Sequence, residues 1–177
     1  MRPLKAEELE KVEKKLRQYV GSNYHSFLNP MYTLVLNNQK VYYVTKSLLV
    51  KAAMTSRSDL ECIGTCLGRF TRSDYFRLKI TALHVLNTYC VNKVKVKPSA
   101  EMNVLYGNHV LRSHLGGFAP DIKKNAGVLL TTNHGVPLGF GVMSKSSSEI
   151  VSTDGKAVVV VRHGDSGEYL RAEEDLM

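Results

Sequence analysis

The chain has 177 residues, of which 44% are hydrophobic and 23% are charged. This length allows one large or two small domains, and the composition is ordinary for a soluble globular protein. The formal net charge is +8, which favours a polyanionic partner, although a generic basic surface is the alternative. The longest uncharged stretch, residues 125–143, is interrupted by Asn, His, Pro and Gly and is therefore no membrane span.

Cysteine use and charge distribution add two expectations. The chain has three cysteines, an odd and sparse number that argues against a disulfide framework and for a reducing compartment. Its amino end lacks the apolar core of a signal peptide. Residues 1–92 carry 14 basic and 7 acidic side chains, whereas residues 93–177 carry 10 and 9. Four of those acids lie at the end, so residues 173–177 are predicted to form a solvated acidic tail.

The first half, residues 1–92, is predicted to be an α/β domain with a mixed or antiparallel sheet. Apolar residues recur at helical spacing over residues 4–20, and Gly21 is a plausible stop. Short connections favour antiparallel strands. The predicted strands are 32–36, 40–44, 60–67 and 75–80, with helices at 47–54 and 81–89.

The pattern changes near residue 92. Residues 93–97 alternate Lys and Val, so the two valines face a core and the lysines line the other face. Further strands are predicted at 127–132, 136–142, 156–161 and 168–171, with a brief polar loop at 144–148. One helix followed by many short strands suggests a small, nearly closed β-barrel over residues 93–172.

Residues 105–117 are predicted to form a short helix that stops at Gly116 and Gly117. His109, Arg112 and Ser113 would share its wet face, while Tyr106 and Val110 would face the core. Cationic side chains beside exposed glycine backbone are suited to phosphate contacts. No nucleophile or acid pair lies nearby, so the segment indicates binding rather than catalysis.

Other motifs give no catalytic or cofactor site, and no cofactor is expected. Cys62 and Cys66 have a spacing that a zinc pair allows, but a second pair is missing, so buried thiols are favoured over metal ligands. Gly139 and Gly141 begin a dinucleotide-like pattern without its third glycine, and a close-packed strand is the better interpretation.

Two basic segments each have two possible interpretations, an RNA contact or an ordinary solvated strand. Residues 69–79 interleave four basic residues with three aromatics, which fits either RNA stacking or a strand with core rings and solvated charges. The lysine stripe at Lys93, Lys95 and Lys97 is either an RNA contact or a solvated strand face.

Seven sequence blocks occur in order along nearly the whole chain: Met1–Leu4, Val41–Val44, Gly64–Thr71, Phe76–Leu78 with Thr81–Leu83, Leu105–Leu111, Pro137–Gly141 and Gly167–Tyr169. In these blocks the chain resembles the Nip-seven family of PUA-domain assembly factors of the large (60S) ribosomal subunit. The resemblance implies an N-terminal α/β domain, a C-terminal PUA pseudo-barrel, and a non-catalytic role in pre-rRNA processing in the nucleus and nucleolus. The implied partners are pre-rRNA and pre-ribosome proteins, with no membrane, and we expect a monomer.

The resemblance also implies an RNA-binding surface on the PUA domain. Together with the lysine stripe, the expected RNA-binding residues are His109, Arg112, Ser113, Lys145, Lys156, Arg162, Lys95 and Lys97. The chain departs from the family where some members carry a basic cluster, because residues 149–156 contain a single lysine. This departure favours an RNA-binding surface that the PUA domain shares with the more basic first half of the chain. The alternatives are a protein-binding scaffold of pre-ribosomes with little RNA affinity, or an RNA-modifying enzyme.

Overall fold

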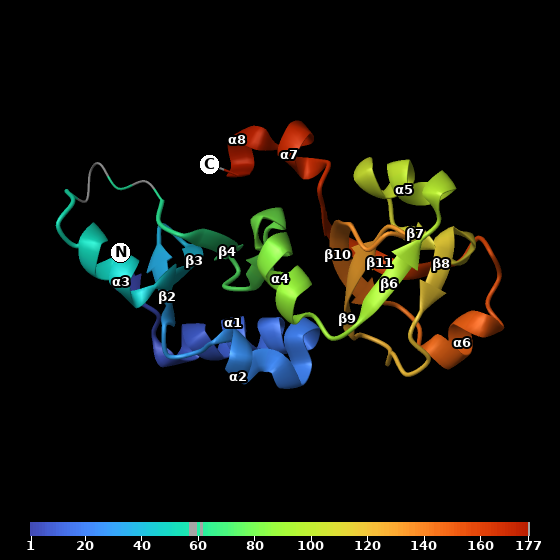
Figure 1. The fold of residues 1–177 in the computed structure, drawn as a ribbon, viewed down its shortest axis with the longest axis horizontal. Helices are drawn as coiled ribbons and strands as arrows, with labels where there is room; N and C mark the ends of the chain where they lie inside the picture. The colour runs from blue at the N-terminus through green and yellow to red at the C-terminus, as the bar shows by residue number, and fades with distance from the viewer. Residues whose placement is uncertain (57–59, 61, 177) are drawn as a thin grey trace.

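The computed structural model describes residues 1–56, 60 and 62–176, and it contains two sheets at opposite ends of the molecule (Figure 1). Sheet A has the spatial order β1 (Arg2–Pro3), β2 (Tyr32–Asn37), β3 (Lys40–Thr45), β4 (Thr65–Phe70) and β5 (Phe76–Leu78). Sheet B has the order β7 (Val110–Leu111), β11 (Val158–Asp165), β10 (Pro137–Met143), β9 (Gly127–Thr131), β6 (Lys93–Val96) and β8 (Leu115–Phe118).

The helices lie around and between these sheets. They are α1 (Ala6–Val20), α2 (Tyr24–Phe27), α3 (Lys46–Ala52), α4 (Leu83–Tyr89), α5 (Pro98–Leu105), α6 (Ser147–Val151), α7 (Glu168–Arg171) and α8 (Glu173–Leu176), with 3₁₀ turns at Gly21–Asn23, Ile80–Ala82 and Arg112–His114. The predicted fold class, an α+β chain with an antiparallel sheet followed by a barrel, is confirmed. In the described ranges no helix is both long and apolar enough to cross a membrane.

Helix α1 follows from its apolar periodicity and its ends. Val12, Leu16 and Tyr19 are at most 1% exposed, as the helical spacing requires. Glu8 accepts the backbone N–H of Lys5 at 2.8 Å and so satisfies a free donor of the first turn. Gly21 ends the helix with a φ of +54°, a conformation that glycine adopts without strain. The predicted helix and its stop are confirmed.

Sheet A is antiparallel throughout, as its short connections predict. The β2–β3 turn contains Asn38 and Gln39, both with positive φ. The strand predicted at 60–67 instead runs from Thr65 to Phe70, and residue 61 of that prediction lies outside the described residues. The strand predicted at 75–80 is reduced to Phe76–Leu78, because a 3₁₀ turn begins at Ile80 and leads into α4.

Sheet B curves into a nearly closed barrel. The alternation in β6 is confirmed: Val94 and Val96 are completely buried, whereas Lys93 and Lys95 are exposed. β6 pairs antiparallel with β8 and parallel with β9, so it lies between two strands that follow each other in the chain. The two valines therefore enter the barrel core while the lysines remain on its outer face.

The helix predicted at 105–117 is wrong. α5 ends at Leu105, and the chain then extends as β7 and β8 around a single 3₁₀ turn. The physical reason is tertiary pairing, because β7 bonds to β11 and β8 bonds to β6. Tyr106 is 67% exposed rather than in the core, while Val110 is buried as predicted.

Two further predictions in the second half are corrected. Residues 168–171 form helix α7 rather than a strand, and Glu173–Leu176 of the expected tail form α8. Both helices leave the barrel and pass over the other half of the molecule (Figure 1). The predicted polar loop at 144–148 is interrupted by α6, which begins at Ser147 because the Glu149 carboxylate accepts the N–H of Ser146 at 2.8 Å.

The hydrophobic core of the first half extends to Leu129 and Phe140 of the barrel, and Tyr19 of α1 lies at this junction. Its ring meets Phe140 of β10 edge-on, with 5.6 Å between ring centroids. Its hydroxyl lies 2.8 Å from Nδ1 of His163 in β11. Gln18 donates to the carbonyl of Asn125 at 2.7 Å, across the same boundary. These contacts fix the position of α1 against the barrel.

Gly127 of β9 provides the space for Tyr19. A Cβ at this position would lie 2.6 Å from the Tyr19 ring and 2.8 Å from the Gln18 carbonyl oxygen. We expect Gly127→Ala to lower the free energy of unfolding by about 1–3 kcal/mol through overpacking, measured by urea denaturation. Gly117→Ala is the control, because its Cβ would meet only Lys95 Cδ at 4.0 Å. Equal stability of the two variants would contradict this view of the interface.

Candidate nucleic-acid interface

Several predicted RNA-binding residues meet where the 3₁₀ turn Arg112–His114 packs on the barrel. Lys97 donates from Nζ to the carbonyl of Ser113 at 2.9 Å, and Ser113 donates its N–H to Gly155 at 3.0 Å. Arg112 donates from Nε to the carbonyl of Ile150 at 2.9 Å. The turn is thus held between the end of β6 and the segment before β11. These bonds bring Lys97, Arg112, Ser113 and the adjoining Lys156 to one edge of the barrel.

Lys145 belongs to the same edge but is restrained. It is half-buried and donates to the Thr153 hydroxyl at 3.1 Å, and that hydroxyl donates to the Glu149 carbonyl at 2.7 Å. Lys156 is exposed and forms no ion pair within the described residues. The barrel edge therefore combines a restrained cation with a free one.

Lys95 extends this region along β6. It lies directly opposite Gly117 of β8, and Gly116 beside it is exposed. Cations and bare glycine backbone therefore do lie together, in paired strands rather than at the end of a helix. We call the region the barrel-edge surface, defined by Lys95, Lys97, Arg112, Ser113, Lys145 and Lys156.

His109 and Arg162 lie apart from the barrel-edge surface. Arg162 is near the end of β11, whereas Lys156 precedes its start. The N–H of Arg162 donates to Nδ1 of His109 at 3.3 Å. Arg162 Nη1 also pairs with Asp165 at 2.5 Å and with Glu168 at 2.6 Å. The structure therefore does not gather all eight predicted residues in one patch.

The Arg162 ion pairs belong to a network around a buried carboxylate. Asp165 is completely buried and also pairs with Arg171 at 2.9 Å and accepts the N–H of Gly167 at 3.0 Å. A buried carboxylate requires such partners to offset its desolvation. The charge of Arg162 is thus largely compensated within the protein, which makes it a structural cation.

Sequence reasoning missed that lysines of α1 border two cavities, one of which reaches the barrel. A cavity of about 530 Å³ lies between the halves, bordered by Lys15 of α1, by Tyr75 to Leu78, and by Arg162 and His163. The spacing of α1 places Lys11, Lys14 and Lys15 away from its core side, but only the packing of α1 shows what they face. The basic segment 69–79 is divided by the fold, because Phe70 and Phe76 are buried and Tyr75 is exposed.

The cysteines are unequal. Cys90 is buried, Cys66 is half-buried and Cys62 is exposed, so the expectation of buried thiols is wrong for Cys62. Burial raises the pKa of the Cys66 and Cys90 thiols. Across the part of the chain that the structure describes, no three His, Cys, Asp or Glu side chains are grouped as metal ligands would be.

Comparison with known proteins covers both halves of the chain. Residues 1–80 match the NIP7/UPF0113 pre-PUA domain, and residues 92–174 match the UPF0113 PUA domain. Proteins named 60S ribosome subunit biogenesis protein NIP7 homolog are similar over their whole length: that of Danio rerio is 41% identical over 99% of both chains, and that of Dictyostelium discoideum 42% over 100% of both. The chain belongs to the NIP7 family.

Solved structures share the fold at lower sequence identity. A PUA-domain protein from Aeropyrum pernix K1 superposes with a TM-score of 0.63 at 15% identity, over 96% of this chain and 87% of that one. A hypothetical protein from Pyrococcus horikoshii OT3 gives 0.60 at 18% identity, over 99% of both chains. The arrangement of a pre-PUA sheet and a PUA barrel in this NIP7-family chain is therefore one that other proteins also adopt.

The assignment of Arg162 to the structure can be tested by stability. Arg162→Ala removes one partner of buried Asp165, and we expect the free energy of unfolding to fall by about 2 kcal/mol. The loss is smaller than for a sole partner because Arg171 still pairs with Asp165. Lys156→Ala is the control and should stay within about 0.5 kcal/mol in the same urea denaturation. If both substitutions lower the free energy of unfolding equally, Arg162 is an ordinary surface cation rather than a structural one.

His163 gives the domain junction a pH dependence. Partial burial, with Lys15 and Arg162 nearby, lowers the pKa of His163 to about 4. The pKa of a histidine in the unfolded chain is about 6.5. Between pH values of about 4 and about 6.5, the unfolded chain therefore binds more protons than the folded chain. The contribution of neutral His163 to the free energy of unfolding is complete above a pH of about 6.5 and is lost as the pH falls towards about 4.

The matched variant is His163→Gln, whose amide oxygen can still accept a hydrogen bond from the Tyr19 hydroxyl. We expect wild type to lose more stability than this variant as pH is lowered from about 7 to about 4.5. Urea denaturation at several pH values measures the difference. A difference that stays constant across this window would show that His163 titrates normally.

Proposed function

We propose that this chain is a non-catalytic RNA-binding factor in pre-rRNA processing and in assembly of the large ribosomal subunit. The names of its relatives support the assembly role, because proteins 41–42% identical over nearly the full chain are called 60S ribosome subunit biogenesis proteins. The corresponding partners are pre-rRNA and pre-ribosome proteins, and the corresponding location is the nucleus and nucleolus. Those names describe biogenesis rather than a reaction, so the proposal assigns no catalysis.

The barrel-edge surface carries the RNA-binding part of the proposal. Within residues 93–172, which we propose as the RNA-binding domain, Lys95 and Lys156 are exposed and have no carboxylate partner among the described residues. Gly116 beside Lys95 is exposed and carries no side chain. Arg112, Ser113 and Lys97 are held in place by the hydrogen bonds to the barrel. Preorganised donors beside free cations suit a polyanion backbone.

The test is RNA binding by a charge-reversed variant. In Lys95→Glu/Lys156→Glu, we expect affinity for pre-rRNA fragments to fall about tenfold or more at moderate salt, without sequence preference. The slope of log affinity against log salt should shrink by about 1.4, for two single-strand phosphate contacts. Filter binding at several salt concentrations measures both values.

The control for charge is Lys46→Glu/Lys51→Glu on α3. Both lysines are exposed, and α3 lies at the end of the molecule away from the barrel (Figure 1). The net charge change is the same, so non-specific attraction falls equally. If both double variants lose the same affinity, the chain binds RNA by overall charge alone. A wild type that binds no RNA even at low salt would contradict the proposal.

A protein-binding scaffold is the second candidate, and the compensated charges favour it. Arg162 is neutralised by Asp165 and Glu168, and Lys145 is restrained, so only part of the expected RNA surface is free. The scaffold predicts that the Lys95→Glu/Lys156→Glu variant still co-purifies with pre-ribosomes. Such co-purification by a wild type without measurable RNA affinity would favour the scaffold.

A further inference from the structure

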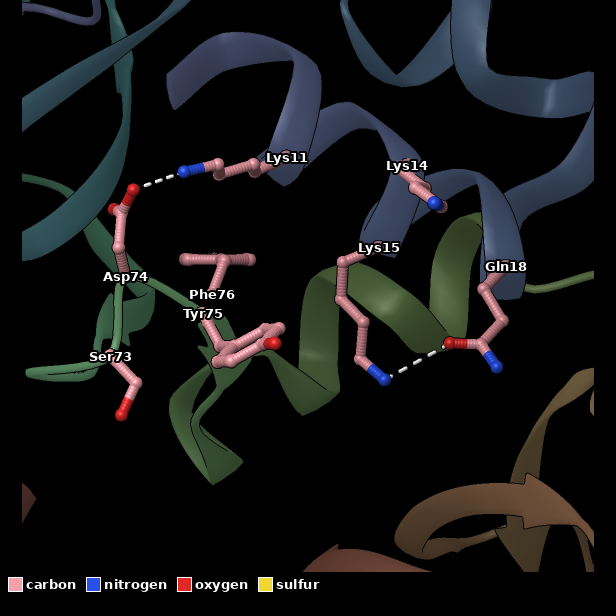
Figure 2. A pocket seen from close by; sticks show the side chains of 8 residues that line it. All are labelled: Lys11, Lys14, Lys15, Gln18, Ser73, Asp74, Tyr75 and Phe76. Atoms are coloured by element: carbon pink, nitrogen blue, oxygen red, sulfur yellow. Dashed lines mark hydrogen bonds and ion pairs between the residues drawn. The ribbon is translucent and has the colours of Figure 1, made fainter. Parts of the chain in front are cut away.

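A groove begins within the first half of the molecule, beside α1, and continues to the barrel. One cavity of about 720 Å³ is bordered by the lysines of α1 and by Ser73 to Phe76, as Figure 2 shows. The second cavity, of about 530 Å³, continues to His163 of β11. Lys15, Tyr75 and Phe76 border both cavities, so the two are parts of one interdomain groove.

An aromatic ring is displayed in the middle of this groove. Tyr75 is 73% exposed, whereas the neighbouring Phe76 is 7% exposed. The ring of Tyr75 packs on no other aromatic ring of the described residues. Its backbone is nevertheless ordered, because Tyr75 exchanges hydrogen bonds with Thr71 at 2.9 and 3.1 Å. A fixed turn thus presents a free π-face to the groove.

Two of the cations around Tyr75 have no ion-pair partner among the described residues. Lys14 and Arg77 are exposed and form no ion pair within the described residues. Arg77 lies directly opposite Arg69 in the β4–β5 ladder, an unfavourable pairing of like charges that an anion would relieve. The acid that borders the groove is Asp74, which is already paired with Lys11 (Figure 2). The groove is therefore strongly cationic on both sides of the ring.

We propose that the interdomain groove binds a single-stranded RNA segment, with one base stacked on Tyr75 and its flanking phosphates contacted by Lys14 and Arg77. An exposed aromatic between free cations matches single-stranded nucleic acid, whose unstacked bases need a π-face and whose phosphates need charge. A duplex hides its base faces, and an acidic peptide gains nothing from the ring. The inference rests on the proposed function and adds a second RNA site in the first half of the chain.

The first test distinguishes the aromatic character of the Tyr75 side chain from its size. Tyr75→Leu removes the π-face and Tyr75→Phe keeps it; because the side chain is exposed, both should melt at the wild-type temperature. We expect Tyr75→Leu to weaken binding of an oligo(A) of about 12 nucleotides at least about fivefold, and Tyr75→Phe to stay within about twofold. Fluorescence anisotropy with the full chain measures this. Equal affinities for all three proteins would overturn the inference.

The second test concerns charge and ligand class. Lys14→Glu/Arg77→Glu should weaken oligo(A) binding and lower its salt dependence, whereas Lys46→Glu/Lys51→Glu should change both less. Ultraviolet crosslinking of the bound oligonucleotide should place a modified nucleotide on Tyr75 or a neighbouring residue. Polyglutamate that competes as well as oligo(A) would overturn the inference in favour of an acidic peptide site.

The outcomes distinguish this inference from the proposed function. If Lys95→Glu/Lys156→Glu loses RNA while Tyr75→Leu and Lys14→Glu/Arg77→Glu retain it, the barrel-edge surface binds RNA and the groove does not. If the groove variants lose RNA and the barrel-edge variant retains it, the RNA site lies in the first half of the chain. Loss in both sets supports one RNA path across the two halves.

Discussion

The packing of Tyr19 against the barrel is the constraint on which the arrangement of the molecule depends. A short domain buries little surface by itself, so the two halves gain stability from the hydrophobic cluster that crosses their boundary. Gly127 leaves room for the ring, Phe140 meets its edge and His163 meets its hydroxyl. Because Tyr19 and the outward lysines belong to the same helix, the packing of Tyr19 also sets where those lysines lie. The part of the interdomain groove between Lys15 and His163 therefore depends on how Tyr19 packs against the barrel.

A second constraint concerns which cations remain available to a partner. The chain carries a net charge of +8, but net charge alone does not say which side chains face solvent without a counter-ion. Buried Asp165 binds Arg162 and Arg171, and so converts two basic residues into internal structure. The same carboxylate accepts the N–H of Gly167 and helps to turn the chain towards α7. The free cations are left at the barrel edge and along α1 and β5.

The sequence predicted the elements whose stability is local. The helix over residues 4–20, the hairpin around residues 37–39 and the alternating strand at 93–97 each have a clear periodicity and a recognisable end. The helix predicted at 105–117 was wrong because the helical spacing of residues there is accidental. Val110 and Leu111 pair with β11, and the hydrogen bonds of that ladder outweigh the weak local preference. At residues 168–171 the error was the reverse: a strand was predicted, and the residues form helix α7 beside the Asp165 network.

By itself the sequence determined the two-part α+β architecture, the family and the basic character, because these depend on residue pattern and total charge. It also drew attention to residues 69–79 as a basic and aromatic segment. Only the tertiary structure decided that Phe70 and Phe76 are core while Tyr75 is displayed. It likewise decided that Arg162 is compensated and that α1 borders the same groove as β5. The physical reason is that exposure and ion pairing arise between segments distant in the chain, which local spacing does not encode.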